Sequence, residues 1–445
     1  MSQQPIRGGT KLSNGSSAVS PFNKRTVAAA LANYIDAGSI VAGSAGLSLW
    51  VSYLKLSDTQ IGLLGAFSAN AISAAIGALL GGFLADKIGR KAVYTNSMLV
   101  YALGICLVLF GTSFPFLLSG YMIIGLSVGA DITASWTIIA ENAPKKNRAR
   151  HCGVAQVAWA AGAVVVLLLS VLLGDLGLLG NKIVFGHLLV IALITYVLRK
   201  RLPESDAWQD QSESAQAVRK PKTSYLDLLQ PKYLKSILFL MGVYLIWNLA
   251  AGVMGFFMPY IYQQVGGVTA TMANILQMGL FIFTGLGVAF IFMPFADKYR
   301  KTVFGISAFA AVIGWSLFLL PAEGMPILIL FIVMIGMNNG AGQQANYQLW
   351  ASEIFPTEYR ASAQGLMFFL VRISIGAWSL FVPMIISNFG IAFMAAILLG
   401  CVTASMIIGL VFAPNTSGKS LEEIQEELYG TPPAQAGQVQ TRKIM

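Results

Sequence analysis

The sequence predicts an all-α membrane protein with twelve transmembrane helices arranged in two pseudo-symmetric six-helix bundles. Three observations predict this fold. Hydrophobic residues make up 56% of the 445 residues and charged residues only 11%, which is more apolar surface than a soluble core can bury. Long apolar stretches recur along the chain, with the basic residues gathered in alternate loops between them. The two halves of the chain also share repeated motifs.

Each apolar stretch approaches or exceeds the roughly 20 residues that a helix needs to cross a bilayer. The stretches are too long and too uniformly apolar for the strands of a membrane barrel, so helices are the expected spanning structure. The twelve predicted spans cover residues 26–52, 59–84, 92–112, 115–140, 150–174, 180–198, 234–263, 270–296, 302–320, 325–350, 361–387 and 390–412.

The placement of charge favours a membrane over a nucleic acid. A net charge of +10 would suit a nucleic-acid partner. The basic residues, however, lie in alternate loops, and the loops between them carry only Lys55 and Lys182. This is the pattern of cytoplasmic loops in membrane proteins. We therefore expect a monomeric, multi-pass protein of the plasma membrane, which is the inner membrane of a bacterium, with both termini cytoplasmic, a lipid bilayer around it and no nucleic-acid partner.

A long polar segment divides the spans into two sets of six. Near the C-terminus, Ser420 and Glu423 have the spacing of a capping box, which predicts a short amphipathic helix. The predicted organisation is a disordered cytoplasmic N-terminus at 1–25, a first bundle at 26–198, a cytoplasmic linker at 199–233, a second bundle at 234–412, and a cytoplasmic tail with the short helix at 413–445.

An acidic and a basic residue recur together in the two halves. The stretch "AENAPKKNRAR" places Glu141 seven residues before Arg148, and "SEIFPTEYRAS" places Glu353 seven residues before Arg360. The same offset of 212 residues therefore relates both members of the pair. A duplicated chain of this kind predicts two related bundles with a cavity between them.

A second motif recurs at nearly the same offset. The stretch "GGFLADKIGRK" contains Gly82, Asp86 and Arg90, and "FMPFADKYRK" is its counterpart in the second half. Gly82 would let two helices approach closely. Acidic residues add little to the positive-inside pattern, so we interpret Asp86, Arg90 and the two repeated Glu/Arg pairs as gating residues that bridge the bundles in one conformation. Charge that only sets the topology is the alternative.

These motifs resemble a known family. "GGFLADKIGRK" looks like the loop 2–3 signature of the major facilitator superfamily. "AENAP" and "SEIFPTEYR", with "LPES" at 202–205 and "PNTSGKSLEEI" at 414–424, resemble signatures of its sugar-porter-like branch. The resemblance covers essentially the whole chain and implies a metabolite:proton symporter. The chain departs from the pattern at Met122, where sugar porters carry a basic residue, and the second-half copy lacks the glycines of the first.

Three ionisable side chains interrupt the spans, at a cost of about 2.5–3.5 kcal/mol each at a helix centre. Asp36, Asp131 and Arg372 lie at similar depths, so we expect them to face one polar cavity near the midplane. One acid is in excess, which favours Asp36 and Asp131 as proton-coupling residues. The guanidinium suits a carboxylate or a phosphate, which favours Arg372 as a substrate-binding residue. A static ion pair of Asp131 with Arg372 is the structural alternative.

The resemblance adds to this interpretation. "YIDAGS" around Asp36 resembles a stretch in which sugar porters carry an acid linked to proton coupling. "GADITAS" around Asp131 resembles a stretch of phosphate and organic-anion members, and the position of Arg372 resembles an arginine of organic-anion carriers.

Uncharged polar and aromatic residues complete the predicted substrate site. In "NNGAGQQANYQLW", four of them recur at helical spacing and form one stripe, which lines the cavity or joins two helices. The stripe consists of Asn339, Gln343, Asn346 and Trp350, and further candidates are Gln156, Trp159, Trp247 and Asn248.

The predicted function is secondary active transport. We expect proton symport of a small polar metabolite, which is a sugar acid, another carboxylate, or a sugar or polyol, by alternating access. The alternatives are a proton-coupled antiporter that exports a metabolite or drug and a non-transporting nutrient receptor on a carrier fold. No nucleophile–base pair or phosphate-binding loop is present in the sequence, and its histidines and cysteines have no metal-ligand spacing. We therefore expect no enzyme activity, no cofactor and no metal.

Overall fold

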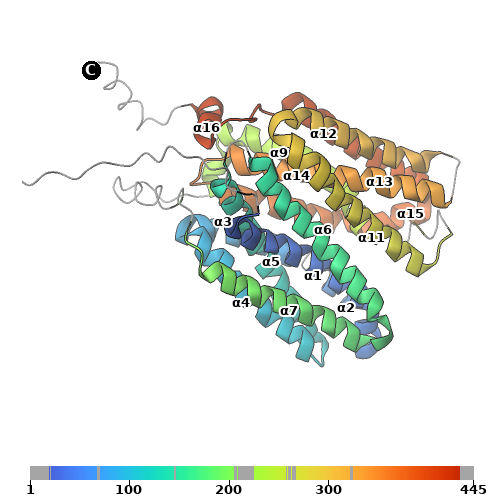
Figure 1. The fold of residues 1–445 in the computed structure, drawn as a ribbon. Coiled ribbons are helices and arrows are strands. Elements are labelled where there is room, and N and C mark those ends of the chain that lie inside the picture. Colours follow the sequence, from blue (N-terminus) through green and yellow to red (C-terminus); the bar gives the residue numbers. More distant parts are fainter. Residues whose placement is uncertain are drawn as a thin grey trace, which may run out of the picture.

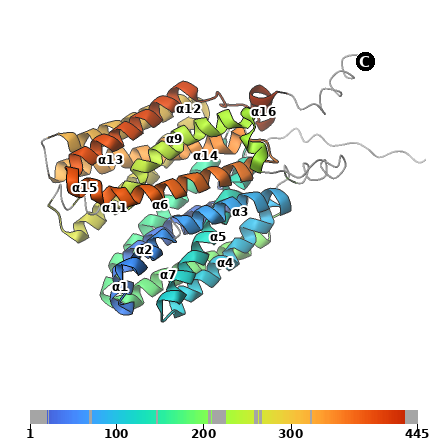
Figure 2. The ribbon, with the colours of Figure 1, turned by 180° about the vertical axis from the view of Figure 1, so that it is seen from behind.

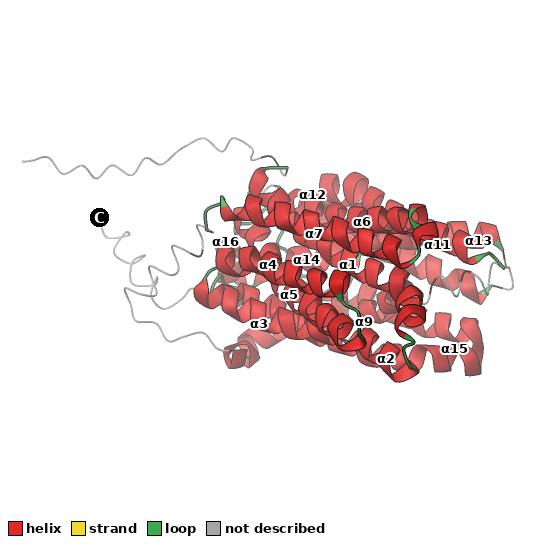
Figure 3. Ribbon diagram, turned by 90° about the horizontal axis from the view of Figure 1, so that it is seen from below, coloured by secondary structure: helices red, strands yellow, loops and turns green. Residues whose placement is uncertain are grey.

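The computed structural model describes residues 20, 22–67, 71–144, 147–204, 208, 225–256, 258, 262, 267–320 and 324–430. Helices form nearly all of this part of the chain, and no strand occurs in it (Figure 3). Most of the predicted N-terminal tail, much of the predicted linker and residues 431–445 lie outside the described residues.

The described part of the first half contains six helical units. The second unit is interrupted between α2 and α3, and Gly89, at a φ of 104°, separates α3 from α4. The side chain of Asn23 caps α1 by accepting the N–H of Thr26, and Ser57 and Gln60 form a capping box on α2. The helices are α1 (Lys24–Leu54), α2 (Asp58–Ala66), α3 (Ile72–Ile88), α4 (Arg90–Phe110), α5 (Phe114–Asn142), α6 (Arg148–Leu172) and α7 (Leu178–Lys200), with a 3₁₀ turn η1 (Gly174–Leu176) before α7.

The second half has longer continuous helices with internal breaks. The chain turns at Tyr299 inside α12 and at Gly390 inside α15, where φ is 81°. The helices are α9 (Pro231–Phe256), α11 (Ala270–Gly287), the π-helix η3 (Val288–Phe292), α12 (Met293–Ser316), α13 (Met325–Ala341), α14 (Gln343–Ile354), α15 (Arg360–Phe412) and α16 (Leu421–Tyr429), with 3₁₀ turns η2 (Tyr225–Leu229) and η4 (Leu317–Leu319).

In the residues that the structure describes, each of the twelve predicted spans coincides with one or two of these helices over most of its length. In the described part of the chain, nine helices are long and apolar enough to cross a membrane. One of the nine, at 272–319, contains two predicted spans joined at Tyr299. Helix α1 and the pair α2–α3 supply the remaining two spans. The predicted all-α membrane fold is therefore confirmed.

The helices form two bundles that lie side by side. Helices α1–α7 make one bundle and α9–α15 the other, as both opposite views show (Figures 1 and 2). The bundles meet closely where α3 crosses α15. A Cβ at Gly82 would lie 2.4 Å from the carbonyl oxygen of Ala361, and one at Gly365 would lie 2.4 Å from that of Ala78. The close helix contact predicted at Gly82 is thus present, because only glycine fits this approach.

Buried apolar side chains form three clusters that follow the two bundles. One cluster lies within the first bundle, a second lies mainly within the second bundle, and a third joins them through residues of α5, α6, α14 and α15. The outer faces carry many exposed large apolar side chains, such as Phe110, which is 80% exposed. An apolar exterior of this kind suits the hydrocarbon core of a bilayer.

Candidate functional site

A cavity of about 710 Å³ lies between the two bundles. Helices α1, α5 and α6 line it from the first bundle, and α9, α11, α13, α14 and α15 line it from the second. The lining extends to Gly174 and Gly255, at the end of the molecule opposite the basic loops. Its polar and aromatic members include Asp36, Gln156, Asn248, Asn274, Gln277, Asn339, Gln344, Arg372, Trp136, Trp159, Tyr244, Trp247, Phe281 and Phe368.

An ion pair crosses the cavity from one bundle to the other. The Nη2 atom of Arg372 on α15 lies 3.7 Å from Oδ1 of Asp36 on α1. The Asp36 side chain is 2% exposed, and the Arg372 side chain is 12% exposed. The guanidinium lies over the ring of Phe368, 4.6 Å from its centroid, which holds it by a cation–π contact. Two of the three predicted charges therefore meet in the cavity.

The tryptophan next to this pair fixes the carboxylate. The indole Nε1 of Trp159 on α6 donates a hydrogen bond of 3.0 Å to Oδ2 of Asp36. The Trp159 ring packs edge-on against Phe281 of the second bundle, with the ring centroids 5.5 Å apart. The Asp36 carboxylate is thus oriented by its own bundle while it faces the cation of the other.

Asp131 does not lie in the cavity, so the prediction that the three charges converge is wrong for this residue. Its carboxylate is paired with Arg199 of α7, through a short contact at Oδ1 and a hydrogen bond of 3.2 Å at Oδ2. Ser97 also donates to Oδ1. Arg199 in turn donates to the carbonyl oxygen of Ala28. This network joins α1, α4, α5 and α7 within the first bundle.

The sequence analysis missed Arg199 as the partner of Asp131. The sequence places it at the start of the basic run after helix 6, which suggested a linker residue. In the structure it is the penultimate residue of α7 and is fully buried. A long arginine side chain at a helix end can reach back into the bundle, and the excess acid of the first half was the signal for such a partner.

The predicted polar stripe on helix 10 is broken by a kink. Backbone φ and ψ at Gly342 are −92° and −129°, so α13 ends at Ala341 and α14 starts at Gln343. A uniform helical spacing does not hold across such a break. Asn339 lines the cavity as predicted, and Gln344, which the stripe omitted, lines it as well.

The other three members of the stripe lie outside the cavity lining. Gln343 accepts a hydrogen bond of 2.7 Å from Asn338, and Asn346 donates to the carbonyl oxygens of Ala341 and Gly342. These contacts stabilise the kink, since they satisfy backbone and side-chain groups that the interrupted helix leaves open. Trp350 packs between Phe239 and Phe304, with both centroids 5.4 Å away.

Gln156, Trp159, Trp247 and Asn248 all line the cavity, as the sequence predicted. Gln156 donates a short hydrogen bond to Gln348 of α14, which joins the bundles at the floor of the cavity. Trp247 donates 3.2 Å to Oδ1 of Asn338, and Asn248 donates 2.8 Å to the carbonyl oxygen of Tyr244.

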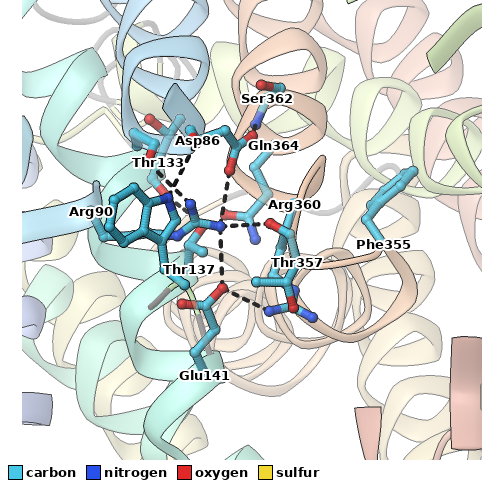
Figure 4. Close-up of polar contacts among 12 residues, drawn as sticks. Asp86, Arg90, Thr133, Thr137, Glu141, Phe355, Thr357, Arg360, Ser362 and Gln364 are labelled. Atoms are coloured by element: carbon cyan, nitrogen blue, oxygen red, sulfur yellow. Dashed lines mark hydrogen bonds and ion pairs between the residues drawn. The ribbon is translucent and has the colours of Figure 1, made fainter. Parts of the chain in front are cut away.

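Four of the predicted gating residues lie together, namely Asp86, Arg90, Glu141 and Arg360 (Figure 4). They lie at the end of the molecule that carries the basic loops. Nη2 of Arg90 lies 2.9 Å from Oδ1 of Asp86 and 3.3 Å from Oε1 of Glu141. Glu141 also pairs with Arg360 of the second bundle at 2.9 Å. We call these four residues the first latch. It is tied to the second bundle again by Asp86, which accepts the N–H of Ser362 at 2.7 Å.

Burial raises the pKa of Asp86 to about 6, although the Arg90 guanidinium and the hydrogen bond from Ser362 lower it in part. The carboxyl group lies at the end of α3, outside the predicted span. It therefore takes up a proton at a higher pH in this closed arrangement than it would in water.

A second latch repeats the first with the bundles exchanged. Glu353 of the second bundle pairs with Arg300 of its own bundle at 2.7 Å and with Arg148 of the first bundle at 3.0 Å. Asp297 accepts the N–H of Ala149 at 2.8 Å, as Asp86 accepts that of Ser362.

Each buried glutamate thus holds one arginine from each bundle. Arg300 and Asp297 were absent from the predicted gating set, although the repeat itself, through "FMPFADKYRK", pointed to them.

The duplicated architecture, the central cavity and the paired latches agree with the comparison to known families. The sequence profile of the Major Facilitator Superfamily matches residues 26–379, which is most of the chain. The chain belongs to this superfamily. The resemblance inferred from the sequence motifs is thereby confirmed, and so is the expectation of a transporter fold and not an enzyme.

Several characterised or solved proteins are similar to this chain. It is 86% identical over 437 residues to the "Minor myo-inositol transporter IolF" of Bacillus subtilis (strain 168), which covers 97% of this chain and 99% of that protein. It is 26% identical over 414 residues to the "Putative metabolite transport protein YaaU" of Escherichia coli (strain K12), covering 88% and 91%. The solved proton:xylose symporter XylE, bound to 6-bromo-6-deoxy-D-glucose, superposes with a TM-score of 0.75 at 19% identity, covering 91% and 98% of the two chains.

Proposed function

We propose that this protein imports a cyclic polyol of the myo-inositol class together with a proton. The observation that carries the proposal is the 86% identity over nearly the whole length to a transporter named for myo-inositol. The cavity is chemically suited to such a ligand. Amide side chains of Gln156, Asn248, Asn339 and Gln344 offer donors and acceptors for hydroxyl groups, and the tryptophan rings supply apolar walls.

The structure suits the outward-facing state of an alternating-access cycle. The positive-inside pattern assigns the end with the basic loops to the cytoplasm. Both latches join the bundles at that end, while the cavity lining extends toward the opposite end. In this proposal the latches keep the cytoplasmic side closed, and their release accompanies opening to the inside.

Asp36 is the proposed proton-coupling residue. Its charge attracts Arg372 across the cavity, so the pair connects the two bundles when the site is empty. Protonation of Asp36 removes its attraction to Arg372 and so weakens this contact between the two bundles. Because Asp131 is enclosed in its own network with Arg199, we assign coupling to Asp36 alone. Arg372 then serves first as the counter-ion of Asp36 and not as an anchor for a neutral polyol.

The test is uptake into proteoliposomes. Radiolabelled myo-inositol should accumulate in vesicles with an alkaline interior, and accumulation should disappear when the pH gradient is collapsed. Asp36→Asn should lose accumulation and keep exchange of internal for external myo-inositol, because exchange needs no net proton movement. Asp175→Asn, at an exposed position, is the matched control and should behave like wild type.

Failure of wild type to bind or exchange myo-inositol would refute the substrate. Export that depends on an opposing proton flux would instead support the antiporter alternative. Accumulation by Asp36→Asn equal to wild type would refute the coupling assignment.

A further inference from the structure

The cavity contains very little formal charge. Among the described residues that line it, Asp36 is the only acid and Arg372 the only base. They stand on opposite bundles, on α1 and α15. The lining therefore has a net charge of zero when Asp36 is ionised and +1 when Asp36 is protonated. The other buried pair of the spans, Asp131 with Arg199, is neutral as a pair and lies outside the lining.

We propose that the proton-loaded cavity binds monoanionic polyhydroxylated acids, such as hexuronates, with their carboxylate at Arg372. The proposal rests on the proton site assigned above and extends the substrate class of the same cavity. A neutral polyol and a proton leave the loaded cavity at +1, whereas a monoanion and a proton leave it neutral. A buried charge without an opposite charge costs several kcal/mol, so protonation of Asp36 favours the anion.

The geometry of the ion pair permits this exchange of partners. The 3.7 Å separation between Arg372 and Asp36 is longer than a charge-assisted hydrogen bond of about 2.7–2.9 Å. Asp36 is held instead by the indole of Trp159. Arg372 is the more exposed partner of the pair, at 12% against 2%, so the cation and not the acid is presented to the cavity.

The orientation of the guanidinium is also suited to a carboxylate. The cation–π contact with Phe368 restrains the position of the guanidinium, whose N–H groups can bind a carboxylate in bidentate fashion. Phe368 is itself held by an edge contact to Trp136 at 6.0 Å. The amides that would serve a polyol lie in the same lining and would serve the hydroxyl groups of a sugar acid.

The pH dependence arises at Asp36. Among the described residues, the phenols of Tyr101 on α4 and Tyr244 on α9 also interact electrostatically with Asp36. An ordinary phenol, with a pKa of about 10, is neutral near neutral pH. On α7, His187 is bonded to Tyr34 at 2.9 Å and not to Asp36. Lowering the pH therefore adds the positive charge by protonating Asp36, and anion binding should strengthen as the pH falls.

The experiment compares D-glucuronate with D-glucose, which differ by a carboxylate in place of a hydroxymethyl group. Each is used to compete with radiolabelled myo-inositol for the purified full-length protein at acidic and at neutral pH. We expect glucuronate to compete about tenfold better at acidic pH, which corresponds to about 1.4 kcal/mol. Competition by glucose should change much less.

Two variants separate the possible causes. Arg372→Gln should weaken competition by glucuronate at least tenfold more than competition by glucose, while Arg201→Gln, at an exposed position, should leave both unchanged. In proteoliposomes, proton-driven glucuronate uptake should be insensitive to membrane potential, and myo-inositol uptake should be accelerated when the interior is negative.

Binding of myo-inositol without any competition by glucuronate at acidic pH would overturn this inference and leave the proposed function standing. If Arg372→Gln weakened competition by glucuronate and by glucose equally, that result would also overturn the inference. If glucuronate binds and myo-inositol does not, the proposed substrate fails while the anion site is supported.

Discussion

Replacing Glu353 with glutamine should open the end of the protein that carries the basic loops, which is the proposed cytoplasmic side. Glu353 is 1% exposed and receives Arg148 from one bundle and Arg300 from the other, at 3.0 and 2.7 Å. Glutamine keeps the size of the side chain and one oxygen acceptor but removes the negative charge. The side chains of Arg148 and Arg300 are each 4% exposed. Without the anion between them, the two buried guanidinium groups repel each other.

The size of the effect follows from the burial of these groups. Removing one partner of a buried ion pair costs about 3–5 kcal/mol. Because glutamine retains one oxygen that can accept a hydrogen bond, we expect a cost at the lower end of this range. Opening at the cytoplasmic side relieves the strain because it exposes both arginines to water. A relative gain of about 3 kcal/mol for the open state corresponds to a shift of roughly a hundredfold in the equilibrium.

Native Cys152 reports this opening. It is 1% exposed and lies in the apolar cluster that joins the bundles, one turn beyond Arg148. With Cys106 and Cys401 replaced by alanine, the alkylation rate of Cys152 by a water-soluble reagent measures how often the cytoplasmic side is open. Glu353→Gln should raise this rate by one to two orders of magnitude.

The control is a second glutamate-to-glutamine change. Glu427 pairs with Lys419 at 2.6 Å, but its side chain is 59% exposed, so Glu427→Gln should leave the rate unchanged. The pseudo-symmetry of the latches predicts that Glu141→Gln acts like Glu353→Gln. An unchanged Cys152 rate in a folded Glu353→Gln protein would refute the role of the second latch.

Three further predictions concern other parts of the same machinery. Burial raises the pKa of Asp86 to about 6 in the closed latch, so the closed state binds this proton more tightly than the open state. Low pH therefore favours the closed state. As the pH rises from about 4 to about 6, the closed state loses up to about 3 kcal/mol of stability relative to the open state. Cys152 alkylation, normalised to unfolded protein at each pH, should rise over that interval and level off above it, and Asp86→Asn should flatten the profile. Gly82→Val should hinder closure, since its Cβ would lie 2.4 Å from the carbonyl oxygen of Ala361, and should raise Cys152 alkylation, whereas the same change at Gly376, which has open space, should not. Arg199→Leu should lower the free energy of unfolding by about 3–5 kcal/mol, because it leaves the buried Asp131 carboxylate without its cationic partner. Proton-coupled uptake by the folded fraction should persist. A selective loss of coupling would refute a purely structural role of Arg199.

The sequence predicted most of the fold because its signals were local. The lengths of the apolar stretches predict the number of the spans without any knowledge of packing. The repeated Glu141/Arg148 and Glu353/Arg360 pairs likewise pointed to charges that bridge the bundles, but the structure exchanges their partners, with Glu141 on Arg360 and Glu353 on Arg148.

The errors arose where pairing depends on the third dimension. The depth of Asp131 along its helix placed it near the cavity, but depth does not say which face of α5 turns toward the cavity. In the structure, Asp131 pairs with Arg199 inside the first bundle. The stripe on helix 10 assumed one uninterrupted helix, and the break at Gly342 rotated Gln344 into the lining in place of Gln343.

The most direct test of the account is proton uptake on substrate binding. Myo-inositol is added to the purified protein in weakly buffered solution near neutral pH, and the change in free proton concentration is recorded. If Asp36 releases Arg372 and is protonated with the substrate, wild type should take up protons, fewer than one per protein for this neutral ligand, and Asp36→Asn none. Equal proton uptake in Asp36→Asn, or its loss only when Asp131 is neutralised in a folded variant, would contradict the central claim.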